Sequence, residues 1–253
     1  IMNYLIGDIG NTNIKICKLN NKFEITKSFL FNTNDKNLLS QFRKKINKIL
    51  KGNINKNILL SSVVPAVYTK LKWFLRKKKF KTYEIKDFDL NLLMKFNVKN
   101  FNQLGSDRIA NALGVNTKAK SNYIIVDFGT ATTFDIIKKK NIYDGGIIAP
   151  GIKLSIENLS THTALLPTFK LNSYPVNYGK NTKEALSSGF FWGYQGLINN
   201  ILSKITKKNG KNCKIVLTGG YSYLFRKFLN KKTTIENNIT MKGIIKIYKT
   251  FLL

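Results

Sequence analysis

The sequence predicts an α/β fold built from two similar lobes, and two observations carry that prediction. Apolar, strand-like runs alternate with segments of helical period along the chain. Two of the strand runs end in the same kind of corner, an Asp-x-Gly turn, at Asp8-Ile9-Gly10 and at Asp127-Phe128-Gly129. With 253 residues, of which 43% are hydrophobic, the chain has enough apolar material for two modest cores.

The first half opens as three short strands joined by tight turns. Asn20-Asn21 is a natural hairpin corner between the second and the third strand. A buried strand run and a helix entered through Pro65 come later, since proline is favoured at the first helical position. The expected segments are strands at residues 4–7, 13–19, 23–30 and 58–64, and helices at residues 38–50 and 65–79.

The second half repeats this order of strands. Strands are expected at residues 123–126, 131–137 and 142–143, and helices at residues 183–207 and after 218–220. The tail from Met241 to Leu253 is apolar enough to pack back on the protein, as a helix or as a strand. We therefore expect an N-terminal lobe at residues 1–117 and a C-terminal lobe at residues 118–253, with the boundary near Val115 to Ser121.

The charge of the chain is strongly positive. Lys and Arg number 43 against 13 acidic residues, a formal charge of +30, which raises the question of an anionic partner. The cations are scattered from Lys15 to Lys249 rather than gathered in one arm, and the sequence is also rich in Asn, Ile, Phe and Tyr. We interpret most of the charge as solvated lysine faces enriched by A/T-rich codons, and expect no specific nucleic-acid partner.

Cysteine usage and the start of the chain indicate a reduced compartment. Cys17 and Cys213 cannot supply a disulfide framework or a thiolate metal cluster, which fits the cytoplasm. The apolar start at residues 1–6 is too short for a signal peptide or a membrane span, and no membrane segment is expected elsewhere.

The first Asp-x-Gly corner has the chemistry of a phosphate site. Gly10 lets the backbone approach phosphate oxygens, Asn11 and Thr12 can donate hydrogen bonds, and Lys15 adds positive charge. Asp8 can orient Mg²⁺, usually through water. The alternative is an ordinary hairpin corner, because Asp and Gly are common turn formers.

Two further motifs add candidate groups. Asp127 to Thr133 carries three threonine hydroxyls behind the second corner, more donors than a hairpin needs, although threonine also favours strand starts. In Gly105-Ser106-Asp107-Arg108, Asp107 can accept a hydroxyl proton and Arg108 can grip a carboxylate or a phosphate. A plain helix N-terminus, capped by Ser106, explains the same residues. If the two corners face each other, they can clamp a triphosphate from both sides.

Seven motifs occur in a fixed order, and together they resemble the type III pantothenate kinases of the acetate and sugar kinase, heat-shock protein and actin superfamily. The resemblance covers about residues 3 to 225 and implies a duplicated, two-lobed, actin-like (ribonuclease H-like) fold with a nucleotide cleft between the lobes. The motifs are Asp8 to Lys15, Gly105 to Arg108, Asp127 to Thr133, Gly145 to Gly151, Thr163 to Pro167, Gly179 to Ala185 and Thr218-Gly219-Gly220.

The resemblance implies a kinase that moves phosphate from ATP to pantothenate, the first step of coenzyme A biosynthesis, and that works as a homodimer. Asp107 is then the general base. Asp127 holds a monovalent cation, K⁺ or NH₄⁺, and Asp8 holds Mg²⁺, directly or through water. Pantothenate is bound by Gly105, Ser106, Asp107, Arg108 and Thr182. ATP is bound by Asp8, Ile9, Gly10, Asn11, Thr12, Asn13, Ile14, Lys15 and Thr130.

Two alternatives stay open at this point. One is a non-catalytic regulatory or accessory member of the same fold, against which the intact Asp8, Asp107 and Asp127 speak. The other is a kinase for another small hydroxy acid, carboxy acid or sugar. The sequence also departs from the family upstream of Gly105, with Val98 and Phe101 where a Tyr and a Pro usually help to wall the acceptor pocket.

Overall fold

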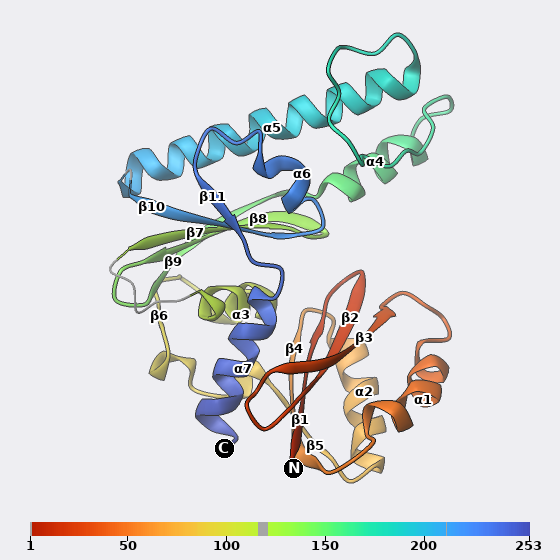
Figure 1. Ribbon diagram of the computed structural model, residues 1–253, viewed down its shortest axis with the longest axis vertical. Helices are drawn as coiled ribbons and strands as arrows, with labels where there is room; N and C mark the ends of the chain where they lie inside the picture. Colours follow the sequence, from red (N-terminus) through yellow and green to blue (C-terminus); the bar gives the residue numbers. More distant parts are fainter. Residues whose placement is uncertain (1, 116–120, 211) are drawn as a thin grey trace. The chain divides into compact units, whose positions relative to one another are not determined.

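The computed structural model describes residues 2–115, 121–210 and 212–253, and the chain divides into two compact units. The first unit is Ile1–Asn116 together with Asn238–Leu253, and the second is Thr117–Asn237. The tail expected in a C-terminal lobe of residues 118–253 is therefore grouped with the first unit (Figure 1). Of the boundary expected near Val115 to Ser121, residues 116–120 lie outside the described residues.

The first unit contains a mixed five-stranded sheet in the order β3-β2-β1-β4-β5. The three strands at the start of the chain pair in antiparallel fashion, while β4 and β5 run parallel to β1. The expected hairpin at Asn20 forms, and its side chain accepts hydrogen bonds from the Lys22 and Glu24 amides. The strands are β1 (Asn3–Ile9), β2 (Asn13–Leu19), β3 (Ile25–Asn32), β4 (Ile54–Ser62) and β5 (Lys81–Glu84).

Helices cover both faces of this sheet. The helices α1 (Leu38–Ile49) and α2 (Pro65–Lys77) pack on one face through an apolar cluster that includes Ile9 and Leu60. On the other face lie α3 (Ser106–Gly114) and α7 (Ile239–Phe251), the helix formed by the tail. The connection between β5 and α3 is made of η1 (Ile85–Asp87), η2 (Leu90–Leu92), β6 (Lys95–Phe96) and η3 (Phe101–Gln103).

The second unit repeats the strand arrangement of the first. Its strands lie in the order β11-β10-β7-β8-β9, so a central strand has an antiparallel hairpin on one side and two parallel strands on the other. This duplication confirms the predicted α/β fold class. The strands are β7 (Asn122–Phe128), β8 (Ala131–Lys138), β9 (Ile142–Pro150), β10 (Cys213–Gly219) and β11 (Thr233–Ile235).

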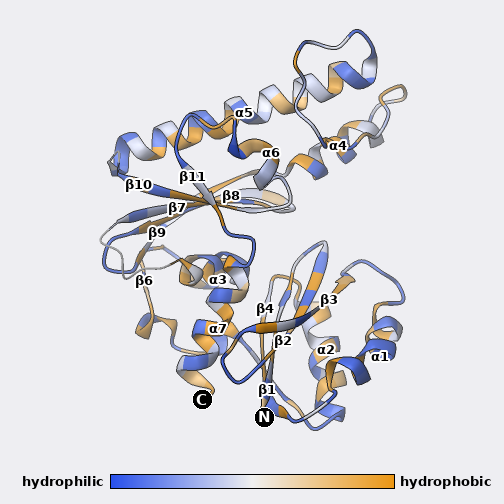
Figure 2. Cartoon of the chain, viewed as in Figure 1, coloured by the Kyte–Doolittle hydropathy of each residue, from blue (hydrophilic) through white to orange (hydrophobic). Residues whose placement is uncertain are grey.

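Three helices cover one face of the second sheet: α4 (Ile152–Thr161), α5 (Thr182–Asn209) and α6 (Ser222–Arg226). Buried apolar residues of the strands and of these helices form one cluster, and Figure 2 shows apolar residues interspersed with polar ones along α5. Because α5 is 28 residues long, only part of its length can be buried against the sheet. Its first turns extend beyond the strands (Figure 1).

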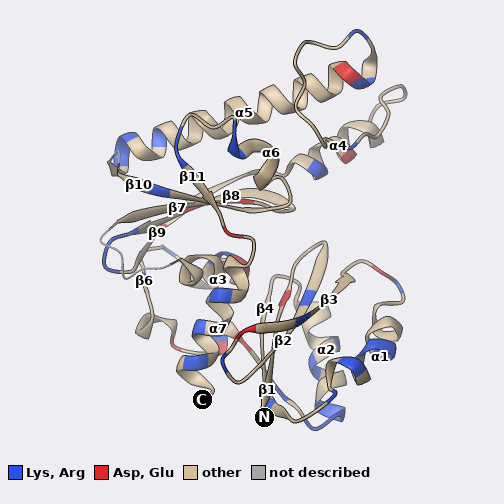
Figure 3. Ribbon diagram, viewed as in Figure 1, with Lys and Arg blue, Asp and Glu red and all other residues tan. Residues whose placement is uncertain are grey.

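Lysine and arginine are distributed over many elements. Figure 3 shows them on α1, α2, α5 and α7 and in several turns, with no single helix or strand carrying them. This distribution agrees with the interpretation of solvated lysine faces. Within the described ranges, no helix combines the length and the apolarity needed to cross a membrane.

Candidate active site

The first Asp-x-Gly corner is the turn between β1 and β2. The Gly10 amide donates to the Asn13 carbonyl at 2.9 Å, and Asp8 lies opposite Lys15 in the antiparallel register. Thr33 at the end of β3 braces the turn, because its hydroxyl donates to the Gly10 carbonyl at 2.7 Å. The Lys15 ammonium group donates to the Asn238 side chain at 3.0 Å. The corner is thus held from two sides.

The Gly105–Arg108 motif forms the start of α3. The Asp107 carboxylate accepts a hydrogen bond from the Arg108 amide at 2.8 Å, at a helix end where amides are otherwise unpaired. A Cβ atom on Gly105 would stand 2.5 Å from Asp107 Oδ1, so the carboxylate occupies the space left by the missing side chain. Burial raises the pKa of Asp107, while the Arg108 amide and guanidinium act in the opposite direction. A raised pKa makes Asp107 a stronger base than an ordinary aspartate.

The first corner and the Gly105–Arg108 motif lie on the same side of the first sheet. Ile9 belongs to the core shared with α1 and α2, so its neighbour Asp8 faces the opposite side, where α3 packs. Val63 links the two motifs, since its amide donates to the Ile9 carbonyl at 3.0 Å and its side chain comes within 3.7 Å of a Cβ on Gly105. The fold therefore brings both motifs to the carboxyl ends of the parallel strands.

The second unit gathers three of the predicted motifs around Asp127. Gly219 has φ +84°, and a Cβ there would stand 2.7 Å from Asp127 Oδ1 and 2.6 Å from the Phe128 carbonyl. A Cβ on Gly151 would overlap the carbonyl oxygen of Thr130. Both glycines are needed because backbone lies directly against them. The corner at Asp127, the Pro150-Gly151 turn and the Thr218-Gly219-Gly220 loop thus form one continuous structure.

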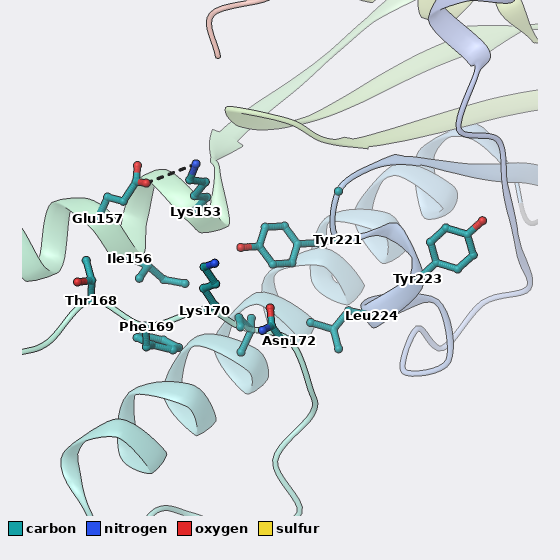
Figure 4. Close-up of a pocket in the computed structure, with 12 residues that line it drawn as sticks. Lys153, Ile156, Glu157, Thr168, Phe169, Lys170, Asn172, Tyr221, Tyr223 and Leu224 are labelled. Atoms are coloured by element: carbon teal, nitrogen blue, oxygen red, sulfur yellow. Dashed lines mark ion pairs between the residues drawn. The ribbon is translucent and has the colours of Figure 1, made fainter. Parts of the chain in front are cut away.

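A pocket of about 880 Å³ opens beside this corner, between α4, residues 168–172 and the start of α6. Gly220, whose amide donates to the Phe128 carbonyl at 3.2 Å, belongs to its wall. Figure 4 shows the Tyr221 ring between Lys153 and Leu224, while Tyr223 points away from the other lining residues. The wall combines aromatic rings, lysines and an amide. Its lining residues are Lys153, Ile156, Glu157, Thr168, Phe169, Lys170, Leu171, Asn172, Gly220, Tyr221, Tyr223 and Leu224.

Thr182 lies on the wall of a second and largely apolar pocket of about 560 Å³. It is the first residue of α5, after Asn181, whose side chain accepts from the Glu184 amide at 3.0 Å. The pocket is lined by Pro150, Ser155, Leu159, Leu166, Thr182, Ala185, Leu186, Gly189, Phe190, Gly193, Tyr194 and Leu197.

The two residues upstream of Gly105 that differ from the family, Val98 and Phe101, are apolar. Phe101 packs edge-on against Phe96, with ring centroids 4.8 Å apart, and Lys86 Nζ lies 6.0 Å from the Phe101 centroid. Val98 is half-buried nearby in the sequence. At these two positions the wall before α3 presents apolar side chains instead of a tyrosine hydroxyl.

Sequence reasoning missed Glu84, which ends β5 beside α3. Its carboxylate accepts hydrogen bonds from the Ser62 amide at 3.3 Å and from the Lys86 amide at 2.6 Å. An acidic residue at the carboxyl end of a parallel strand is a sequence signal that could have found Glu84. Ligands bind at that edge of an α/β sheet. The signal can be used only if residues 81–84 are predicted as a strand, and they were not among the expected strands.

Oxygen ligands for a metal ion are few in each unit. Over residues 2–115, 121–210 and 212–253, no group of three or more His, Cys, Asp or Glu side chains stands close enough to form a metal cage. A Mg²⁺ ion that takes most of its ligands from phosphates and water needs only one or two carboxylates. Asp8, near the end of β1 beside the Gly10 turn, fits that kind of site.

The repeated sheet order and the paired Asp-x-Gly corners define the class of fold, a duplicated, actin-like α/β fold. A putative 2-dehydro-3-deoxygalactonokinase from Sinorhizobium meliloti has this fold with a TM-score of 0.61 at 9% identity, covering 98% of both chains. A putative Baf family transcriptional activator from Campylobacter jejuni also gives a TM-score of 0.61, at 24% identity, and covers 97% of this chain and 98% of its own.

The particular family follows from the sequence comparisons. The model of the type III pantothenate kinase family matches residues 4–204. A type III pantothenate kinase of Pelagibacter ubique is 43% identical over 243 residues, which are 96% of this chain and 97% of that protein. The chain belongs to the type III pantothenate kinase family, and the resemblance seen in its ordered motifs is confirmed.

Proposed function

We propose that this chain transfers the γ-phosphate of ATP to a hydroxyl of pantothenate, the first step of coenzyme A biosynthesis, with Asp107 as the general base. The observation that carries the proposal is the Asp107 carboxylate, which lies over Gly105 beside Arg108 on the same side of the sheet as the first corner. Its raised pKa suits a group that takes a proton from an alcohol.

Arg108 is proposed to hold the pantothenate carboxylate. A guanidinium matches a carboxylate in a planar, two-pronged contact, and Arg108 follows the base directly in the sequence. Gly105 and Ser106 complete the turn that the acceptor approaches, and Thr182 is proposed as a further contact. Together these groups fix the acceptor hydroxyl against the base, and positioning of this kind supplies much of the catalysis in phosphoryl transfer.

ATP is proposed to bind through residues 8–15 and Thr130. The turn at Gly10 lets the backbone come close to a phosphate, and the Lys15 ammonium group supplies charge that can leave Asn238 for it. Mg²⁺, held by Asp8 directly or through water, neutralises phosphate charge when it is bound. The pocket at Gly220 and Tyr221 is proposed to take the base of the nucleotide, since its wall includes Gly220, the last residue of the loop that packs on Asp127.

Asp127 is proposed to hold a monovalent cation, K⁺ or NH₄⁺. Its carboxylate lies against the Gly219 backbone beside the Phe128 carbonyl, so several oxygen atoms are available in a small space. We expect Asp127→Asn to make the rate independent of K⁺ at constant ionic strength set with Na⁺. The measurement is the initial rate of ADP release over a KCl series.

The control for the cation prediction is Asp144→Asn. Asp144 is a carboxylate on β9 of the same unit, paired with Lys138 at 2.7 Å, and its loss should leave the salt response unchanged. A normal K⁺ response of the Asp127→Asn enzyme would contradict the cation assignment.

A homodimer is proposed to form through one face of α5. Ala185, Gly189 and Gly193 recur every four residues, so they share that face, and a Cβ on either glycine would meet nothing within 4 Å. The segment that precedes α5 carries exposed apolar side chains, with Leu165 90% exposed and Val176 82% exposed. Apolar surface of this kind on a metabolic enzyme marks an interface, and a second copy of the chain is the occupant we propose.

We expect Gly193→Arg to convert this dimer to a monomer without unfolding the chain. The new side chain enters open space in the single chain but projects into the proposed partner. The measurement is mass by light scattering, with circular dichroism to verify folding. Ser203→Arg, an exposed change further along α5 and outside the apolar pocket, is the matched control and should stay dimeric. A dimeric Gly193→Arg protein would place the interface elsewhere.

The cytoplasm is the proposed location. Cys17 and Cys213 are both free thiols, which fits a reducing compartment where ATP is available.

The proposed reaction is tested by ADP release with pantothenate, with sugars and with acetate as acceptors. We expect release that depends on pantothenate alone. Turnover with a sugar or with acetate in place of pantothenate would indicate a kinase for another acceptor. Retained ATP binding without turnover on any acceptor would indicate an accessory protein.

A further inference from the structure

Lys15 is the cation of the proposed phosphate corner, and its side chain contacts the tail of the chain. Ile14 and Ile16 flank it in β2 and belong to the core shared with α1 and α2, so Lys15 faces the side of the sheet where α7 packs. Its ammonium group donates to the Asn238 side-chain oxygen at 3.0 Å. The charge of the corner is thus held by an uncharged amide from a distant part of the sequence.

Asn238 is the N-cap residue of α7, but its side chain does not cap the helix. Asparagine is favoured at this position because its side-chain oxygen usually accepts from the open amides of the first turn. The Asn238 side chain makes no such hydrogen bond, although its backbone carbonyl accepts from the Lys242 amide at 2.9 Å. The side-chain oxygen goes to Lys15, so the usual stabilising role of an N-cap asparagine is not the one it has here.

The start of α7 is fixed in place by α3. A Cβ atom on Gly114 would overlap the Ile239 carbonyl oxygen, so the backbone of α7 lies directly on α3 just after Asn238. The Thr240 hydroxyl donates to the side chain of Asn111, a buried residue of α3, at 2.7 Å. Asn238 is therefore a fixed acceptor, whereas a lysine ammonium group sits on a flexible four-carbon stem.

We propose that Asn238 is a positioning residue for Lys15 that lowers the affinity of the corner for ATP: it holds the ammonium group, and a phosphate at the Gly10 turn must draw the group away. This inference rests on the proposed function, in which Lys15 binds ATP phosphates. The net contribution of one protein hydrogen bond corresponds to a factor of about 2–10 in an equilibrium constant. Competition from Asn238 should weaken ATP binding by that factor.

The test measures the Kd for ATP by titration of the full chain and of Asn238→Ala. We expect alanine to tighten ATP binding by about 2–10-fold, because the ammonium group is no longer held. Damage to a binding site weakens binding, so a gain in affinity has no explanation in a merely structural role. Alanine removes no side-chain cap, and the melting temperature should change little.

Asn238→Ser is a second variant that protects the test against poor folding. Serine is as good an N-cap residue as asparagine, so α7 should begin normally. Its side chain is shorter and withdraws the oxygen from Lys15. We expect the same tighter binding of ATP as in Asn238→Ala.

Lys15→Met shows whether the effect passes through Lys15. Loss of the charge should weaken ATP binding. Asn238→Ala should then have no further effect in the Lys15→Met background, because both changes remove the same contact. Adenosine carries no phosphate, so its Kd should be the same for Asn238→Ala and the unaltered chain.

The matched control is Asn3→Ala. Asn3 lies at the opposite end of β1 from the corner, and its side chain donates to the Asn53 carbonyl at 3.2 Å. The change likewise removes one asparagine side chain with its hydrogen bond from the first unit. We expect the Kd for ATP to stay unchanged.

The outcomes separate this inference from the proposed function. If Asn238→Ala leaves ATP binding unchanged or weakens it, or if it acts equally in the Lys15→Met background, the positioning role is overturned while the kinase assignment stands. If Lys15→Met binds ATP as tightly as the unaltered chain, the proposed phosphate site fails and this inference fails with it. Tighter ATP binding by Asn238→Ala without turnover on pantothenate would support the inference and overturn the proposed acceptor.

Discussion

Asp107→Asn is expected to lower kcat with pantothenate by about 10²–10⁴-fold, the usual range for loss of a general base. Asparagine keeps the shape of the side chain and can still accept from the Arg108 amide, so the start of α3 should be preserved. ATP binding should change little, because the phosphate corner at residues 8–15 belongs to other strands. The measurements are steady-state kinetics with pantothenate and a titration with ATP.

The pH dependence of the same reaction gives an independent check. The base must be ionised, and burial raises the pKa of Asp107 above that of an ordinary aspartate. Activity should therefore be complete above this raised pKa and should fall as the pH drops through it, at a higher pH than an unperturbed aspartate would give. The residual activity of Asp107→Asn should lack this acidic limb. An Asn variant with undiminished turnover would refute the assigned role.

The repeated part of the fold could be predicted from the sequence because it is encoded locally. Turn residues such as Asn20 and the corners at Gly10 and Gly129 mark where strands end, and the apolar runs between them have the lengths of strands. Pro65 likewise marks the first residue of α2. These signals lie within a few residues of the structure that they specify.

Two of the elements that were not predicted, β5 and α7, are decided by other parts of the chain. Residues 81–84 carry charged residues at both ends and become β5 only through pairing with β4. The tail has apolar residues at spacings that suit either a strand or a helix. It forms α7 because Gly243 lets the helix approach the Ala110 backbone of α3. That contact joins residues more than a hundred positions apart.

The candidate site shows the same division. The chemistry of Asp8, Asp107 and Asp127 could be inferred from residue types and motif order, since each carboxylate stands beside a glycine turn. The contacts between the motifs could not be inferred in this way. Nothing in the sequence indicates that Gly151 lies on Thr130, or that the Ser62 amide donates to Glu84. Such contacts follow from how the strand ends meet in space.

Gly219→Ala is expected to be strongly destabilising at the second corner. At φ +84° a side chain is strained, and its Cβ would stand 2.6 Å from the backbone of Phe128, which cannot move without breaking the pairing of β7 with β10. Strain and overlap together place the loss above about 3 kcal/mol, in the upper range for one substitution. The measurement is the free energy of unfolding from denaturant titration.

Gly220→Ala is the matched control for this change. A Cβ on Gly220 would meet nothing within 4 Å, and this glycine does not have a positive φ, so we expect stability to change by less than about 0.5 kcal/mol. The two variants differ by one position in the same loop and add the same single methyl group. If both lose little stability, the Gly219 backbone does not lie against Phe128 as described, and the loop cannot shape the space around Asp127. If only Gly219→Ala is unstable, that glycine is required for the corner itself.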